Sequence, residues 1–163
     1  IFLEGLTKIT TGITLINKKY KKGQFYHYLT EPSNAILVPK IKNFFLVVEQ
    51  KRIPINKKNF EFPSGWIDSS EKPIEAAKRE FLEETGYQTR NNPTKLVEFY
   101  ADPGRGSRSC FCFFSKNIIK KRLPEKNIKI FFKTEKQIKN LIKQKKFNNA
   151  SHIAVFYYFL NNV

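Results

Sequence analysis

The chain has 163 residues, enough for one domain with a sizeable core, and its composition is 40% hydrophobic and 15% aromatic. This composition excludes an intrinsically disordered chain, and no apolar run reaches the roughly 18 residues that would predict a membrane-spanning helix. The 30 basic and 14 acidic residues give a formal net charge of +16, which attracts anionic substrates and is compatible with nucleic acid as a partner. Because the lysines are spread through predicted turns and helices, compositional bias explains the charge better than a dedicated nucleic-acid surface.

The first half of the chain is expected to consist mainly of strands. Residues 9–16 have a strand pattern and are followed by a basic turn at 18–23, and residues 24–30 alternate between apolar and polar side chains. Residues 35–38 and 44–48 are short, nearly continuous apolar runs, which are typical of the central strands of a sheet.

The second half is expected to mix strands and helices. Residues 61–65 lead into a helix predicted for residues 71–85, and glycines with a proline predict a loop at 102–106. The remaining predicted elements are strands at 96–100, 110–114 and 128–132 and helices at 136–143 and 149–160. This order predicts an α+β fold, with helices packed on a mixed β-sheet, in a single domain that spans residues 1–163.

Two cysteines, Cys110 and Cys112, are two residues apart on a predicted strand and therefore point to the same side. A disulfide or half of a zinc site are the alternatives, but the chain has no further cysteine to complete such a site. Two small strand side chains in a reducing compartment are the favoured interpretation, so we expect a cytoplasmic protein. Residues 1–16 also lack the basic start and the uninterrupted apolar core of a signal peptide.

The helix predicted at residues 71–85 has recognisable ends. Ser69 or Ser70 can cap its start, and Pro73 lies in the first turn, where a missing N–H is not needed. Gly86 fits the position after the helix, where a left-handed backbone conformation ends it.

Carboxylates are concentrated on this helix, in a chain that is otherwise strongly basic. Glu80 and Glu84 are four residues apart and share a face, and Glu83 is three residues after Glu80. Such crowding raises the pKa values of carboxyl groups by repulsion, whereas Mg²⁺ or Mn²⁺ prefers these hard oxygen ligands. Arg79 can pair with Glu83, and Gly65 allows a backbone carbonyl to approach a metal closely. The pattern favours a divalent-metal site over a solvated charged helix.

The spacing resembles the Nudix box, the signature of the Nudix hydrolase family, which runs from a glycine through a glutamate and an Arg-Glu pair to Glu-Glu and a second glycine. The positions of the box are filled by Gly65, Glu71, Arg79, Glu80, Phe81, Glu83, Glu84, Gly86 and Tyr87. Aromatic residues at the two apolar positions are a minor departure. The resemblance implies the Nudix fold, an α/β/α sandwich, and hydrolysis of a pyrophosphate bond with Mg²⁺, or Mn²⁺, as cofactor.

The same resemblance assigns roles to individual residues. The implied metal ligands are Glu80, Glu84 and the backbone carbonyl near Ser64, and the implied catalytic residues are Arg79, Glu83 and Glu125. Arg79 is expected to position Glu83, and Glu83 or Glu125 to orient or deprotonate the attacking water. Glu125 is included because the family usually carries glutamates in a loop after the box. In this chain Glu125 is the only glutamate in the loop at 116–127.

The flanks of the box resemble the ADP-ribose pyrophosphatase branch of the family, and this resemblance covers nearly the whole chain. Arg52 ends a segment similar to the Gln-x-Arg strand end of the branch, and Glu61 begins one similar to its Glu-x-Pro-Ala-Gly motif. Pro103 stands where the branch characteristically has a proline, and residues 146–151 resemble its C-terminal segment. The resemblance implies a nucleoside diphosphate substrate, preferably ADP-ribose, with AMP and ribose 5-phosphate as products.

The implied substrate-binding residues are Arg52, Glu61, Pro103 and Arg105. Arg105 and Arg108 lie in a loop without a glutamate, where they can grip phosphate or remain exposed loop arginines. The branch typically forms dimers with shared substrate sites, so we expect a homodimer to which residues 1–30 contribute. Alternatives are another substrate (a nucleoside diphosphate sugar, an oxidised nucleoside triphosphate or an RNA 5′ end) and a non-catalytic nucleotide- or RNA-binding module.

Overall fold

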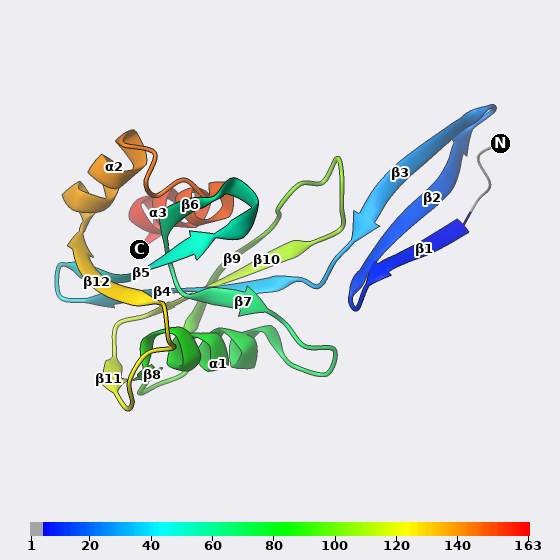
Figure 1. Ribbon diagram of the computed structural model, residues 1–163. Helices are drawn as coiled ribbons and strands as arrows, with labels where there is room; N and C mark the ends of the chain where they lie inside the picture. The colour runs from blue at the N-terminus through cyan, green and yellow to red at the C-terminus, as the bar shows by residue number, and fades with distance from the viewer. Residues whose placement is uncertain (1–4) are drawn as a thin grey trace.

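A mixed β-sheet forms the centre of the molecule (Figure 1). The computed structural model describes residues 5–163 of the chain. Within these residues the sheet has seven strands: β4 (Asn34–Ile41), β5 (Phe44–Arg52), β6 (Lys57–Glu61), β7 (Ser64–Trp66), β9 (Thr94–Tyr100), β10 (Ser109–Ser115) and β12 (Lys129–Thr134). Five of them lie in the order β12-β5-β4-β10-β9, while β6 pairs with β5 and β7 with β4. Only β10 and β4, among these described strands, run parallel to each other.

Helices cover both faces of this sheet (Figure 1). The described helices are α1 (Pro73–Thr85), α2 (Glu135–Lys143) and α3 (Ala150–Asn162), together with a short 3-10 turn, η1 (Ile53–Ile55). On β4, Ala35 and Leu37 pack toward α1, whereas Ile36 and Val38 pack toward α3. Because successive strand residues point to opposite faces, a strand that is covered on both sides must be apolar throughout. The expected α+β class, mixed sheet and α/β/α sandwich are therefore confirmed.

A separate three-stranded antiparallel sheet precedes the sandwich and projects from it (Figure 1). Its strands are β1 (Gly5–Thr10), β2 (Ile13–Lys21) and β3 (Gln24–Thr30). The single strand expected at 9–16 is wrong, because a turn at Thr11 and Gly12 divides it and Gly12 has a left-handed φ of 85°. The basic residues expected to form a turn lie mostly on β2, and the turn follows at Lys22 and Gly23.

The helix that carries the acidic residues begins later than expected. Pro73 is its first residue and Lys72 its N-cap, so the expected caps Ser69 and Ser70 are wrong. Lys72 has extended backbone and makes no capping hydrogen bond through its side chain. Glu71 consequently lies before the helix, in a segment that the side chain of Arg79 reaches from the second turn.

The C-terminal end of α1 anchors the loop that contains Glu125. Gly86 ends the helix with a φ of 72°, as expected, and a Cβ atom there would lie 2.1 Å from the carbonyl oxygen of Arg122. The backbone N–H groups of Lys121 and Arg122 both donate to the carbonyl of Gly86. Beside this contact, β8 (Tyr87–Thr89) pairs with β11 (Ile118–Lys120), two short strands that the sequence patterns did not predict.

The other C-terminal elements agree with expectation to within a few residues. Cys110 and Cys112 are buried, unbridged and packed on the α3 side of β10, as the favoured interpretation requires. Among residues 5–163, none of the helices has both the length and the apolar character needed to cross a membrane.

Candidate active site

Arg79 is the centre of an ion-pair network on α1. Its Nε and Nη2 atoms donate to the two carboxylate oxygens of Glu71 at 3.0 and 2.9 Å. Its Nη1 donates to Glu80 at 2.6 Å and to Glu83 at 3.2 Å, and Nη2 also donates to the backbone carbonyl of Trp66 at 2.9 Å. The hydrogen bonds with Arg79 lower the pKa of Glu71. The expected pairing of Arg79 with Glu83 is present, but the two-pronged contact is with Glu71, a partner that sequence reasoning did not assign.

Glu84 is a buried carboxylate, and in the described residues it has no ion pair. Only 6% of its surface is exposed. One oxygen accepts the backbone N–H of Ser64 at 3.0 Å, and the other accepts Nε2 of Gln50 at 3.3 Å. Burial raises the pKa of Glu84 to about 8, and the neighbouring charge of Glu80 contributes to the same rise. A cation that reached this carboxylate would therefore relieve a real electrostatic cost.

Glu80 lies against the backbone at Gly65. A Cβ atom on Gly65 would be 2.0 Å from the carboxyl carbon of Glu80, so only glycine leaves room for this side chain. Burial raises the pKa of Glu80, although the hydrogen bond from Arg79 opposes the rise. Repulsion between the acids, which the sequence suggested as the main perturbation, is thus secondary to burial.

The donor set fits a divalent cation chemically, because carboxylate oxygens are the ligands that Mg²⁺ and Mn²⁺ prefer. As they stand, however, no three His, Cys, Asp or Glu side chains within residues 5–163 are gathered closely enough to hold a metal ion. Glu80 is turned toward Arg79, and Glu84 toward Ser64, which takes part through its backbone N–H. Each carboxylate oxygen has two lone pairs, so both side chains can keep these hydrogen bonds and still offer oxygen ligands to a cation.

Glu83 and Glu125 both line one hollow at the end of α1. The backbone N–H of Glu125 donates to the carbonyl of Glu83 at 3.0 Å. Together with Arg122, Leu123 and Pro124 they line a hollow of about 340 Å³. The fold thus brings together the two residues between which the sequence left the water-activating role open.

Arg52 and Glu61 form a two-pronged ion pair between the neighbouring strands β5 and β6. Nε of Arg52 donates to one oxygen of Glu61 at 2.9 Å, and Nη2 donates to the other. Asn59 adds a second donor to the first oxygen, and His152 lies on the side of the second. Burial alone would raise the pKa of Glu61, but the hydrogen bonds from Arg52 and the surrounding donors and charges lower it. Glu61 is 1% exposed, which favours a role through Arg52 rather than direct contact with a substrate.

The loop that contains Pro103 and Arg105 is attached to the N-terminal sheet. The backbone N–H of Leu29 on β3 donates to the carbonyl of Arg105 at 2.8 Å. Pro103 lines a hollow of about 280 Å³ whose wall includes three tyrosines: Tyr26, Tyr28 and Tyr100. Arg105 lines a smaller one beside Arg108, which is paired with Glu31. The contacts described for this loop are with β3 and its own neighbours rather than with the carboxylates of α1.

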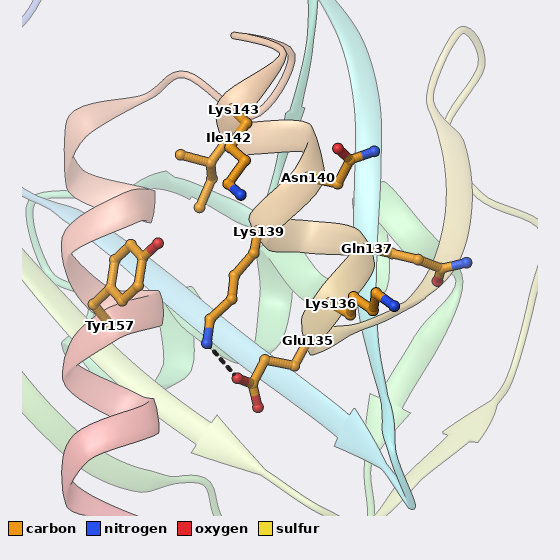
Figure 2. A pocket seen from close by; sticks show the side chains of 8 residues that line it. All are labelled: Glu135, Lys136, Gln137, Lys139, Asn140, Ile142, Lys143 and Tyr157. Atoms are coloured by element: carbon orange, nitrogen blue, oxygen red, sulfur yellow. Dashed lines mark hydrogen bonds and ion pairs between the residues drawn. The ribbon is translucent and has the colours of Figure 1, made fainter.

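A larger hollow, of about 770 Å³, lies elsewhere, between α2 and α3 (Figure 2). Its lining includes Lys139, which bridges to Glu135 at 2.6 Å, and Tyr157 from the facing helix. Because α2 and α3 cover the face of the sheet opposite α1, this hollow is separate from the acidic residues. Size alone therefore does not identify the candidate site.

Sequence reasoning assigned no role to three polar residues near the site, Gln50, Asn59 and His152, although Gln50 is the glutamine of the Gln-x-Arg segment. The period of two along a strand could have found Gln50, because it shares a face with Arg52. No local signal could have found His152, which meets Phe62 across 90 residues of sequence.

Comparison with known proteins gives two kinds of match. The sequence profile described as the NUDIX domain matches residues 31–154, more than half of the chain, and begins just after β3. An ADP-ribose pyrophosphatase of Bacillus subtilis (strain 168) is 32% identical over 84 residues, 52% of this chain and 45% of that protein. A methanol dehydrogenase activator of Bacillus methanolicus is 32% identical over 87 residues, 53% of this chain and 46% of that protein. The chain thus spans less than half of the length of these relatives.

The crystal structure of an ADP compounds hydrolase has a similar fold, with a TM-score of 0.79. The superposition covers 91% of this chain and 84% of that one, at 17% sequence identity. At that identity the likeness establishes the architecture of the chain, including its sheet and helices, and leaves the chemistry to the residues of the site.

Proposed function

This chain belongs to the NUDIX domain family, and on that basis we propose that it is a hydrolase of nucleoside diphosphates linked to a second group, with ADP-ribose as the preferred substrate. Water adds to a phosphorus atom, the anhydride bond breaks, and AMP and ribose 5-phosphate leave. The observation that carries the proposal is the buried Glu84 close to Glu80, two carboxyl groups whose pKa values are raised mainly by burial.

Glu80 and Glu84, with backbone at Ser64, are the residues that would hold Mg²⁺, or Mn²⁺ in its place. A bound divalent cation supplies charge neutralisation on the pyrophosphate oxygens and acidifies water. The chain itself prepares the site in two ways. Gly65 leaves the space that the carboxylate of Glu80 occupies, and Arg79 holds that carboxylate at 2.6 Å.

Glu83 and Glu125 are the candidates for accepting a proton from the attacking water. Glu83 is favoured because its side chain is 45% exposed and is held by Arg79 at 3.2 Å, close to Glu80. Glu125 can assist because it lines the same hollow as Glu83. Arg79 then acts as a positioning residue, since it fixes Glu83 and ties it to the segment before α1.

Arg52 is the proposed contact for a substrate phosphate, and Glu61 holds it in place. Pro103 and the tyrosines around it supply an apolar, aromatic hollow in which a purine base can stack. Arg105 remains a candidate for a phosphate or ribose contact from the same loop. The +16 net charge helps to recruit the anionic substrate.

A homodimer in the cytoplasm is the proposed setting. The sheet β1–β3 projects from the sandwich and lies outside the matched family domain, which suits a segment that contacts a second copy. Residues 1–4 of the expected N-terminal segment lie outside the described residues.

The decisive experiment is a substrate panel with purified protein and Mg²⁺, followed by chromatography of the products. We expect AMP from ADP-ribose and loss of turnover with EDTA. The panel should include nucleoside diphosphate sugars, oxidised nucleoside triphosphates and 5′-triphosphorylated RNA. Turnover of oxidised triphosphates without turnover of ADP-ribose would refute the substrate assignment, and metal-independent binding without any turnover would favour a non-catalytic module.

A further inference from the structure

A cluster of buried polar side chains surrounds the carboxylate that pairs with Arg52, and of its members only Glu61 has a role in the proposed function. Asn59 and Glu61 of β6 and His152 of α3 are each less than 5% exposed. Both oxygens of Glu61 are occupied: one accepts from Arg52 and Asn59 at 2.9 Å, and the other accepts from Arg52 and faces His152. Buried polar groups are costly unless they are paired, so this arrangement needs all of its members in place.

The backbone selects one tautomer of His152. Its Nδ1 accepts the backbone N–H of Phe62 at 3.0 Å. Burial lowers the pKa of His152 to about 4, so the ring is neutral near pH 7. A neutral imidazole carries one proton, and because Nδ1 is the acceptor that proton lies on Nε2. Nε2 is 3.6 Å from the oxygen of Glu61, slightly beyond a hydrogen bond, so its N–H dipole faces the carboxylate.

The position of the His152 ring is constrained from several sides. It stacks on Phe62 with an interplanar angle of 19° and meets Phe147 edge-on at 75°. Asn59, the second support of Glu61, is itself held because its Oδ1 accepts the backbone N–H of Asn148 at 3.0 Å. The segment that leads into α3 therefore fixes Glu61 through both supports.

One edge of the Arg52 guanidinium is hydrogen-bonded to Glu61, and the other edge makes no hydrogen bond within the described residues. Its side chain is 39% exposed, in contrast to the 1% of Glu61. Within the described residues its hydrogen bonds use Nε and Nη2, which leaves Nη1 to meet a ligand. The positive charge of the Arg52 guanidinium also opposes the rise in the pKa of Glu84, one of the candidate metal ligands. An arginine that is already oriented loses less conformational freedom when it binds phosphate.

We propose that His152 is a positioning residue for substrate binding: it orients the carboxylate of Glu61, and Glu61 orients the guanidinium of Arg52 toward a phosphate of the substrate. This inference rests on the proposed function, because it requires Arg52 to contact a nucleoside diphosphate. It adds to that function a buried residue of α3 that acts through two side chains and never meets the substrate.

Substitution of His152 by asparagine or glutamine tests the roles of the two ring nitrogen atoms separately. An asparagine amide reaches about as far as Nδ1 and can still accept from Phe62, whereas a glutamine amide reaches about as far as Nε2 and can still donate toward Glu61. We expect His152→Asn to raise KM for ADP-ribose about tenfold with little change in kcat, as loss of one contact to a charged group would. His152→Gln should stay within about twofold of the wild-type KM, since it keeps the donor.

A second set of variants, based on Arg52→Ala, tests whether His152 acts through Arg52. Arg52→Ala should raise KM by itself, and adding His152→Asn to it should raise KM by no more than about twofold further, because the two residues act in series. Thermal unfolding of every variant, and equilibrium binding of ADP-ribose without metal, complete the series. The binding measurement follows Arg52 independently of turnover.

The outcomes are distinct. If His152→Asn and His152→Gln lose thermal stability but keep the wild-type KM and binding constant, His152 is a structural residue and the inference is overturned while the proposed function stands. Independent, multiplicative effects of His152→Asn and Arg52→Ala on KM would also overturn it. If the wild-type protein neither binds nor hydrolyses ADP-ribose, the proposed function fails, and this inference fails with it.

Discussion

Glu61 and Glu84 are both buried carboxylates, yet their surroundings differ in one decisive respect. Glu61 is held on both oxygens by the guanidinium of Arg52 and on one of them by Asn59 as well, and its pKa is lowered. Glu84 receives two neutral donors and lies close to Glu80, and its pKa is raised to about 8. The first site has its positive charge built into the chain, and the second lacks it.

The difference shows that compensation by a fixed positive charge, rather than burial, distinguishes the two acids. A desolvated carboxylate is stable where a fixed cation compensates it, and such a group has little capacity left for a ligand. A desolvated carboxylate without that compensation stores an electrostatic cost that an external cation can relieve. Glu61 thus fits the proposed role of holding Arg52, and Glu84 fits the proposed role of a metal ligand.

The largest expected effect comes from removing the charge of Glu84. We expect Glu84→Gln to lower turnover of ADP-ribose by about 100-fold or more, because a metal ligand is lost. Without metal, the same variant should become more stable relative to wild type as pH rises from 4.5 through 8. A raised folded-state pKa means that wild-type stability falls over that window. Unchanged turnover would contradict the metal role, and Glu75→Gln on the exposed side of α1 is the matched control.

The pH dependence of stability should reveal His152. Its folded-state pKa is lowered to about 4 from an ordinary value near 6.5, so the unfolded chain binds more protons between these values. Stability is therefore fully present above pH 6.5 and falls by about 3 kcal/mol as pH drops to 4. Urea unfolding measures the free energy of unfolding of wild type and of His152→Asn. We expect the difference between the two proteins to decrease as pH falls through this window. Parallel curves would mean that His152 titrates normally in the folded protein.

A smaller effect is expected from Glu61→Gln, which breaks the ion pair of the framework. We expect a loss of about 2 kcal/mol in the free energy of unfolding, less than for a fully buried pair because Arg52 is partly exposed. The comparison of the two carboxylates predicts changes of opposite sign in the free energy of unfolding. Without metal at pH 8.5, Glu61→Gln should be less stable than wild type, and Glu84→Gln should be more stable than wild type. Chemical denaturation of both variants in the presence of EDTA measures this, and equal signs would remove the distinction between the two carboxylates.

Local patterns were sufficient for much of the fold. The central strands β4 and β5 follow from apolar runs, and the end of α1 follows from Gly86. The turn at Thr11 and Gly12 does not follow from local patterns, because the two residues interrupt a run that is typical of one strand. The sequence predicts the start of α1 two residues too early, because serine is a common N-cap residue. In the structure Lys72 is the N-cap and Pro73 is the first residue of the helix. Boundaries depend on competing local choices that only packing resolves.

For the candidate site, the sequence by itself determined which acids share a face of α1, because residues four apart on a helix must lie together. Only the tertiary structure decided which of those acids have partners. It placed Glu71 on Arg79, Glu125 beside Glu83, and His152 against Glu61. These contacts arise from chain reversals and from packing on two faces of a sheet. Their electrostatic consequences follow from burial, which no periodicity in the sequence encodes.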